Sequence, residues 1–185
     1  MTKLLRSALN GVRCFHVICR GNNKQSVFRD ERDFARYVQL IKRYKSKYDL
    51  KLYAFALMTN HVHMLVEVVK DGDLSKFMQR ISLAYYSWHK NKYNYSGHLW
   101  QGRFKSNPVE DEDYLLQCAR YIELNPVTSQ IVPEPSHYNW SSYNVLGFGK
   151  KSVIIDEHPL YLELGKSPEE RRKSYRGLVL NGGGS

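Results

Sequence analysis

The segment from His61 to Val69 strongly limits the possible folds, because polar and apolar side chains alternate along it. Successive side chains of a β-strand point to opposite faces of the sheet. One face would carry Val62, Met64, Val66 and Val68, and the other His61, His63, Leu65 and Glu67. The first set predicts an apolar strand face that must be covered, most simply by helices.

Apolar patterns on both sides of this segment predict further strands and helices in a definite order. Residues 13–20 and 50–57 are strand-like, and residues 98–109 have the pattern of a strand and a loop. Helical spacing of apolar residues begins after Asp30, which can cap a helix, and again from Asp73. A third helix is expected from about 111 to 124, because acidic residues suit its first turn and Pro126 disfavours helical geometry at Asn125.

The order strand, helix, strand, strand, helix, strand, helix predicts an α+β fold, with an antiparallel sheet and helices packed on one face. A length of 185 residues suits a single domain with a small appendage. Prolines near 133 suggest that residues 1–132 form the main domain. Residues 133–180 would form a small, basic, helical C-terminal extension packed on it, and residues 181–185 a flexible tail.

The charge balance favours a polyanionic partner. Lysine and arginine number 28 against 18 aspartate and glutamate, which leaves a net charge of +10 and points most often to nucleic acid. A solvated basic surface with no such partner is the alternative. The 14 tyrosines, 7 phenylalanines and 3 tryptophans could stack on unpaired bases, although core packing also needs aromatic residues.

Cysteine usage and hydropathy indicate the compartment. Cys14, Cys19 and Cys118 are widely spaced and form no Cys-x-x-Cys pair of the kind used for zinc or redox chemistry. No apolar run approaches the roughly 18 residues of a membrane span, and the N-terminus lacks the apolar core of a secretion signal. We therefore expect a soluble, cytoplasmic protein with reduced thiols and no membrane partner.

His61 and His63 are the first candidate functional residues. Their spacing places both imidazoles on one face of a strand, where the ring nitrogens can converge on one metal ion. Two semi-exposed histidines that are satisfied by ordinary hydrogen bonds are the alternative.

Tyr121 and Asn125 are the second candidates, because residues four apart share one face of a helix. They extend a stripe formed with Tyr114 and Cys118, beside the more apolar stripe of Leu115, Ala119 and Ile122. The alternative is that Tyr121 only packs against the core and that Asn125 only ends a helix before proline.

Together these residues suit phosphodiester cleavage, which needs a cation near the nonbridging oxygens and an in-line nucleophile. A phenol suits the second role because it can leave again, so that the bond energy is kept for rejoining. Two neutral imidazoles and an amide oxygen leave the ion its full positive charge. The set predicts magnesium or manganese rather than structural zinc, since no fourth protein ligand is evident.

Five separated segments resemble the REP-associated tyrosine transposases, a bacterial branch of the single-tyrosine HUH transposases. They are HVICRGNNKQSVF, ALMTNHVHMLVE, HLWQGRFKS, YLLQCARYIELNPV and NWSSY, spread over most of the first 145 residues. The resemblance implies a ferredoxin-like fold, with His61 and His63 as the HUH pair and Tyr121 as the nucleophile. It also implies Asn125 as the third metal ligand, where relatives often have glutamine.

The same resemblance implies the substrate, which is single-stranded DNA with imperfect hairpins from repetitive extragenic palindromes. Cleavage would leave a 5′-phosphotyrosine and a free 3′-hydroxyl without an external energy source. Related transposases act as monomers or as homodimers. One departure is that the first strand lacks the Pro-Arg pair that precedes it in many relatives.

Two further groups are candidate DNA contacts. Arg20, Asn22, Asn23 and Lys24 resemble the N-terminal signature of the family, and Trp100, Arg103, Phe104 and Lys105 interleave aromatic and basic side chains as single strands favour. Trp100 and Phe104 could instead be core residues. His16 is expected to be packed or exposed on its strand, without a role.

The leading hypothesis is a metal-dependent, single-tyrosine DNA endonuclease and strand transferase. A non-catalytic module that binds and regulates hairpin repeats is one alternative. An RNA-directed hydrolase that uses the same metal site is another, and it would turn over without trapping an intermediate.

Overall fold

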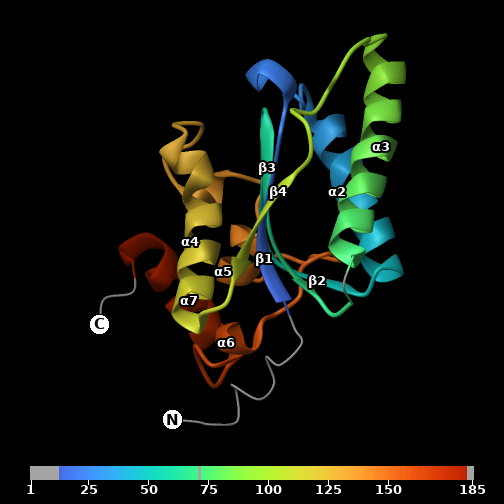
Figure 1. The fold of residues 1–185 in the computed structure, drawn as a ribbon. Coiled ribbons are helices and arrows are strands. Elements are labelled where there is room, and N and C mark those ends of the chain that lie inside the picture. The colour runs from blue at the N-terminus through green and yellow to red at the C-terminus, as the bar shows by residue number, and fades with distance from the viewer. Residues whose placement is uncertain (1–12, 71, 183–185) are drawn as a thin grey trace.

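A four-stranded antiparallel sheet runs through the middle of the molecule in this computed structural model, which describes residues 13–70 and 72–182 (Figure 1). Its strands are β1 (Arg13–Arg20), β2 (Leu50–Met58), β3 (His61–Val68) and β4 (Lys105–Val109), in the spatial order β2-β3-β1-β4. Only Thr59 and Asn60 separate β2 from β3. This end of the sheet therefore brings the start of β3 beside the end of β1.

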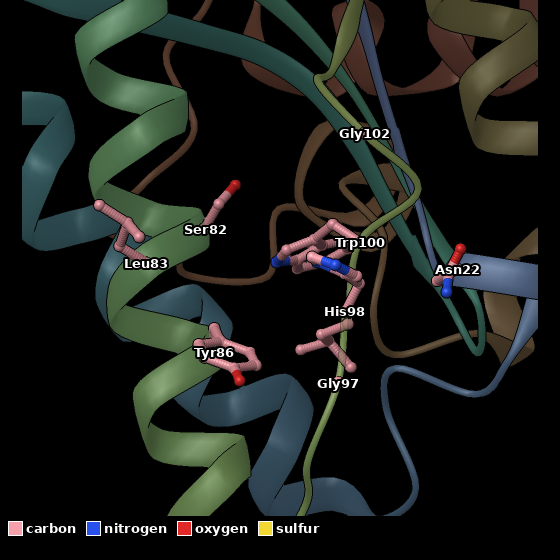
Figure 2. Close-up of a pocket in the computed structure, with 9 residues that line it drawn as sticks. Asn22, Ser82, Leu83, Tyr86, Gly97, His98, Trp100 and Gly102 are labelled. Carbon is pink, nitrogen blue, oxygen red and sulfur yellow. The ribbon is translucent and has the colours of Figure 1, made fainter.

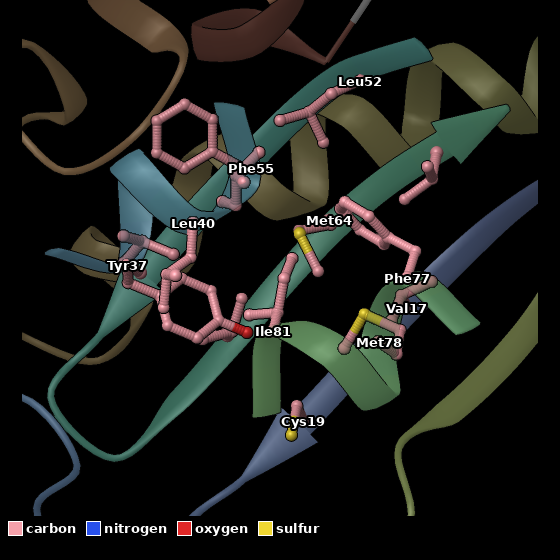
Figure 3. Packing of buried hydrophobic residues seen from close by; sticks show 14 of the residues in the cluster. Val17, Cys19, Tyr37, Leu40, Leu52, Phe55, Met64, Phe77, Met78 and Ile81 are labelled. Carbon is pink, nitrogen blue, oxygen red and sulfur yellow. The ribbon is translucent and has the colours of Figure 1, made fainter. Parts of the chain in front are cut away.

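One face of the sheet is covered by α2 (Glu31–Lys47) and α3 (Asp73–Tyr93) (Figure 1). Asp30 caps α2 as expected, in a reciprocal capping box with Asp33. The predicted apolar face of β3 lies here, where Met64 packs with Phe77, Ile81 and other core residues (Figure 3). Within the described parts of the chain, no helix is long and apolar enough to cross a membrane.

The opposite face is covered by α4 (Glu112–Thr128), so the α+β class is confirmed but the packing of helices on one face is wrong (Figure 1). The reason lies in β2, which is buried along almost its whole length. A strand that is apolar on both sides must be covered on both sides. On the α4 side a second core cluster joins Ala54, Ala56 and Leu65 to Leu115 and Ile122.

The helix α4 also extends further than expected, since it passes Pro126 and ends at Thr128 rather than near residue 124. Proline removes only its own N–H from the helical ladder, and here it does so in the last turn. The turn closes beyond it, because the Ser129 amide donates to the Asn125 carbonyl at 2.9 Å.

The chain after residue 132 forms η2 (Pro135–His137), α5 (Tyr143–Phe148), α6 (Pro159–Leu162) and α7 (Pro168–Asn181). It runs along the outer edge of β2, where the Leu57 amide donates to the Trp140 carbonyl at 2.9 Å. It also has its own small apolar cluster, which includes Tyr143, Tyr175 and Val179.

Asn181, which was expected to begin the tail, belongs to α7, and Gly182 ends that helix at a φ of +77°. The rest of the expected tail, residues 183–185, lies outside the described residues, as do residues 1–12 of the expected main domain.

Candidate active site

Three histidines meet on the α4 face of the sheet, close to the end of β1. The strand register pairs Arg20 with His61 and Ile18 with His63. The ring of His16 stacks on that of His63, with centroids 5.1 Å apart and an interplanar angle of 26°. The ring of His61 lies 4.9 Å from that of His63. The structure therefore brings the predicted pair together with a third imidazole.

The helix α4 places Tyr121 against this row of rings. Its ring centroid lies 5.7 Å from that of His63 and 5.8 Å from that of His16. The tyrosine is nevertheless 53% exposed, because the neighbouring apolar positions of the helix, including Ile122, occupy the interface with the sheet. Tyr121 thus sits beside the histidines with one side open to a large substrate.

Asn125 completes the group from the next turn of α4. Its side-chain amide nitrogen donates to the Tyr121 carbonyl at 2.9 Å, and the same side chain lies beside His61, whose pKa it raises against the larger lowering by burial. Asn125 is only 7% exposed, although Tyr121 one turn earlier is open. The four residues expected to share a site, from β3 and α4, therefore lie together within one chain.

His16 is the residue of this site that the sequence reasoning missed. Its Nε2 lies 2.9 Å from the Nδ1 of His63, and it is buried. Alternation along β1 places His16, Ile18 and Arg20 on one face, but the sequence does not show that this face is shared with His63. The pairing register of β1 with β3 supplies that information.

Burial keeps the imidazoles neutral near neutral pH. It lowers the pKa of His63 to about 3, with smaller contributions from the charges of His61 and His16. Burial also lowers the pKa of His16, and it lowers that of His61 together with the charge of Arg20. Neutral rings can offer nitrogen lone pairs to a cation.

The donor atoms suit a divalent metal ion. The side chains of His61 and His63, from β3, and of Asn125, from α4, lie next to one another, and this set contains no carboxylate. The Nδ1 atoms of both histidines are engaged, by Asn60 at 2.6 Å and by His16 at 2.9 Å. A ligand histidine commonly has its second nitrogen held in this way, so the residues present fit the expected metal centre.

A second group of possible metal ligands, Cys14, Glu67 and His158, lies further along the same strands, with ligand atoms within 4.8 Å of one another. Its polar groups are already engaged within the protein. The Tyr53 hydroxyl donates to Glu67, and the Leu160 amide donates to the Nδ1 of His158 at 3.1 Å. This group is separate from the predicted centre and includes none of its residues.

The candidate DNA contacts fall into two places. Arg20 and Lys105 are both exposed. They lie beside the imidazoles, because Arg20 pairs with His61 and Lys105 pairs with Ile18, which itself pairs with His63. Asn23 and Lys24 are exposed in the turn η1 (Asn22–Lys24) that follows β1, and Arg103 is exposed shortly before β4.

Asn22 and Trp100 instead line an open pocket of about 810 Å³ between α3 and the segment 97–102 (Figure 2). Tyr86 and Leu83 form its α3 side. Trp100 and Phe104 also pack against the α2–α3 core, in agreement with the alternative that they are core residues. These two therefore have a packing role whatever they bind.

The fold and this grouping define an α+β protein with a candidate metal centre and a tyrosine against it. The chain belongs to the transposase IS200-like family, whose model matches residues 13–125. The matched stretch contains His61, His63, Tyr121 and Asn125.

Among solved structures, the chain is similar to a REP-associated tyrosine transposase bound to a REP hairpin, with a TM-score of 0.62 and 16% identity over 80% of this chain and 87% of that one. A protein from Deinococcus radiodurans R1 described as a candidate transposase has 20% identity over 60% of this chain and 88% of its own, with a TM-score of 0.45. No curated protein matches the chain.

Proposed function

We propose that this transposase is a metal-dependent endonuclease and strand transferase for single-stranded DNA, with Tyr121 as its nucleophile. The observation that carries the proposal is the position of the half-exposed Tyr121 ring, 5.7 Å from His63 and 5.8 Å from His16 in the same chain. A tyrosine that served only for packing would have no reason to lie open beside buried, neutral imidazoles.

The metal ligands in this proposal are His61, His63 and Asn125. When bound there, magnesium or manganese supplies positive charge against the nonbridging oxygens of a phosphate. His16 and Asn60 hold the two histidines through their Nδ1 atoms. The bond from Asn125 to the Tyr121 carbonyl ties the amide ligand to the helical turn that carries the nucleophile.

The proposed reaction exchanges one phosphodiester for another. The Tyr121 hydroxyl oxygen attacks phosphorus, its proton passes to solvent, and the bond from phosphorus to the 3′-oxygen breaks as that oxygen takes up a proton. The products are a 5′-phosphotyrosine and a free 3′-hydroxyl. Attack by a 3′-hydroxyl reverses the step, so rejoining needs no nucleotide cofactor.

The proposed substrate is DNA with hairpins of the repetitive extragenic palindrome type. The similar transposase was solved with a REP hairpin, and the net charge of +10 suits a polyanion. The exposed cations that would contact phosphates are Arg20, Lys24, Arg103 and Lys105. Asn23 would contact the DNA beside Lys24. Unpaired bases would enter the pocket lined by Asn22 and Trp100 (Figure 2). Phe104, which packs against the α2–α3 core, is a further proposed DNA contact.

Tyr121→Phe tests the proposal most directly. With magnesium or manganese, the unmodified protein should form an adduct with a hairpin oligonucleotide that survives a denaturing gel, and Tyr121→Phe should form none while still binding the DNA. Tyr114→Phe is a matched control, since Tyr114 lies on the same helix and is 51% exposed. Undiminished cleavage by Tyr121→Phe would refute the role of this residue.

The same assay separates the alternatives. A regulator that only binds hairpins would shift their mobility in native gels and never form an adduct. An RNA hydrolase would cut RNA repeatedly without covalent attachment.

We further propose that each chain can use its own tyrosine, because Tyr121 and His63 meet within one chain. A monomer is then sufficient, whereas a homodimer with exchanged helices would place Tyr121 in the partner's site. Mixing Tyr121→Phe with His63→Ala should leave cleavage absent. Restored cleavage in the mixture would show that the tyrosine acts in the partner.

A further inference from the structure

Asn60 makes hydrogen bonds to two parts of the molecule that the proposed function uses separately. Its side-chain nitrogen donates to the Lys24 carbonyl at 3.1 Å, and its side-chain oxygen lies 2.6 Å from the Nδ1 of His61. Its backbone carbonyl accepts from the Gly21 amide at 2.8 Å. One residue of the β2–β3 turn is thus bonded both to the loop after β1 and to a candidate metal ligand.

These bonds determine where the ring proton of His61 lies. Since the amide nitrogen of Asn60 donates to the Lys24 carbonyl, the atom that faces His61 is the amide oxygen, which can only accept. A neutral His61 ring therefore donates to Asn60 only when its proton is on Nδ1. Its Nε2 keeps the lone pair, which is the arrangement a ligand histidine needs.

The loop that Asn60 holds has an unusual backbone. Asn23 and Lys24 both adopt left-handed conformations, with φ of 50° and 59°. Such conformations cost free energy and persist only where the surrounding structure enforces them. Gly21 is required at the base of the loop, because an added Cβ would lie 2.5 Å from the Gln25 carbonyl oxygen. The bond from Asn60 to the Lys24 carbonyl is one of the contacts that fix this conformation.

We infer that Asn60 is a positioning residue that sets the tautomer of His61 and, through the same side chain, the conformation of the 21–25 loop. Its consequence for metal binding and for DNA binding rests on the proposed function. Its consequence for the His61 ring does not, since that follows from the hydrogen bonds alone.

Two substitutions separate the two bonds. Asn60→Asp keeps an oxygen acceptor for His61 but loses the donor to Lys24, whereas Asn60→Ala loses both. Asn91→Ala, at an exposed position of α3, is the control. Backbone amide spectra of each variant establish that the fold is retained.

The first readout is the ¹⁵N chemical shifts of the His61 ring in metal-free protein at neutral pH. The unmodified protein, Asn60→Asp and Asn91→Ala should show a proton on Nδ1, and Asn60→Ala should populate the Nε2-protonated form. The second readout is Mn²⁺ affinity, which should fall about 10- to 100-fold in Asn60→Ala and be retained in Asn60→Asp. The third is affinity for hairpin DNA, which should weaken in Asn60→Asp as well.

An unchanged His61 tautomer in a folded Asn60→Ala protein would overturn the inference. So would equal loss of Mn²⁺ binding in Asn60→Asp and Asn60→Ala, because the acceptor would then not be the relevant atom. If Tyr121→Phe showed that the proposed cleavage is wrong, the tautomer measurement would still decide the role of Asn60.

Discussion

The two faces of β3 are buried to a similar degree but carry different chemistry. On the α2–α3 side, Val62 and Met64 are fully covered. On the α4 side, His63 is 4% and Glu67 9% exposed. One face stabilises the fold by removing apolar surface from water. The other buries polar groups, which costs free energy unless each group is hydrogen-bonded.

The polar face meets this requirement with side chains from its neighbours. His16 bonds to His63, and Glu67 accepts from Tyr53 and lies 3.6 Å from Lys51. The difference between the faces teaches that the α2–α3 face of β3 only stabilises the fold, whereas its α4 face combines apolar packing by Leu65 with histidine nitrogens held in place by hydrogen bonds. Four substitutions test this division through the free energy of unfolding, from the largest expected change to the smallest.

Met64→Ala should have the largest effect. Truncating a fully buried side chain removes apolar burial and leaves a cavity, at a cost of about 2–5 kcal/mol. Urea denaturation measures this loss, and Val69→Ala, at a position that is 57% exposed, should change stability by no more than about 0.5 kcal/mol. Mn²⁺ affinity of the folded Met64→Ala protein should stay unchanged, because this side chain points away from the histidines. Loss of Mn²⁺ binding in that folded variant would contradict the statement that the α2–α3 face of β3 has no part in the metal site.

Glu123→Gln should come next, with an effect that depends on pH. Glu123 is fully buried in α4 and accepts from Ser142 Oγ at 2.6 Å and from the Tyr175 hydroxyl at 3.1 Å. Burial raises the pKa of its carboxyl from 4.5 to about 8, against smaller opposing effects of its hydrogen bonds. The folded protein then holds a proton that the unfolded chain releases, so stability falls as pH rises from about 4.5 to about 8.

Glutamine accepts the same two bonds and does not ionise. Between pH 5 and pH 7 the unmodified protein should therefore lose roughly 2 to 3 kcal/mol relative to Glu123→Gln. Denaturation curves at several pH values measure this difference. A constant difference across that range would mean that the carboxyl is ionised in the folded protein.

His63→Gln should show the opposite pH dependence. Because burial lowers the pKa of His63 to about 3 from 6.5, the unfolded chain binds a proton that the folded protein does not. Stability is present above pH 6.5 and is lost as pH falls toward 3. From pH 7.5 to pH 5 the metal-free protein should lose about 2 kcal/mol more than His63→Gln does. His137→Gln, at an exposed position, should behave like the unmodified protein, and a parallel loss in His63→Gln would assign the acid sensitivity elsewhere.

The sequence predicted well those features that depend on local spacing. The alternation from His61 onward assigned the faces of β3, and the limits of β1 matched those expected. The spacing of Tyr121 and Asn125 put both on one side of α4, where the structure brings them to the histidines. Each of these predictions uses the period of a single strand or helix.

Features that depend on pairing between distant segments could not be predicted in this way. His16 reaches His63 only because of the register of β1 against β3, which alternation within β1 does not specify. A continuous apolar run such as β2 does not reveal that helices cover both of its sides. Asn60 was likewise overlooked, because its role depends on the folded position of the 21–25 loop.

Tyr121→Phe should have the smallest effect on stability, although it should abolish the covalent adduct. Phenylalanine keeps the ring that contacts His16 and His63 and removes only a hydroxyl from a side chain that is 53% exposed. The free energy of unfolding should change by no more than about 0.5 kcal/mol, as for most surface substitutions. Parallel thermal denaturation of Tyr121→Phe and Tyr114→Phe measures this. A clear destabilisation confined to Tyr121→Phe would mean that its hydroxyl stabilises the fold. The proposed difference between a face that stabilises the protein and a face that carries the reactive groups would then be wrong for Tyr121.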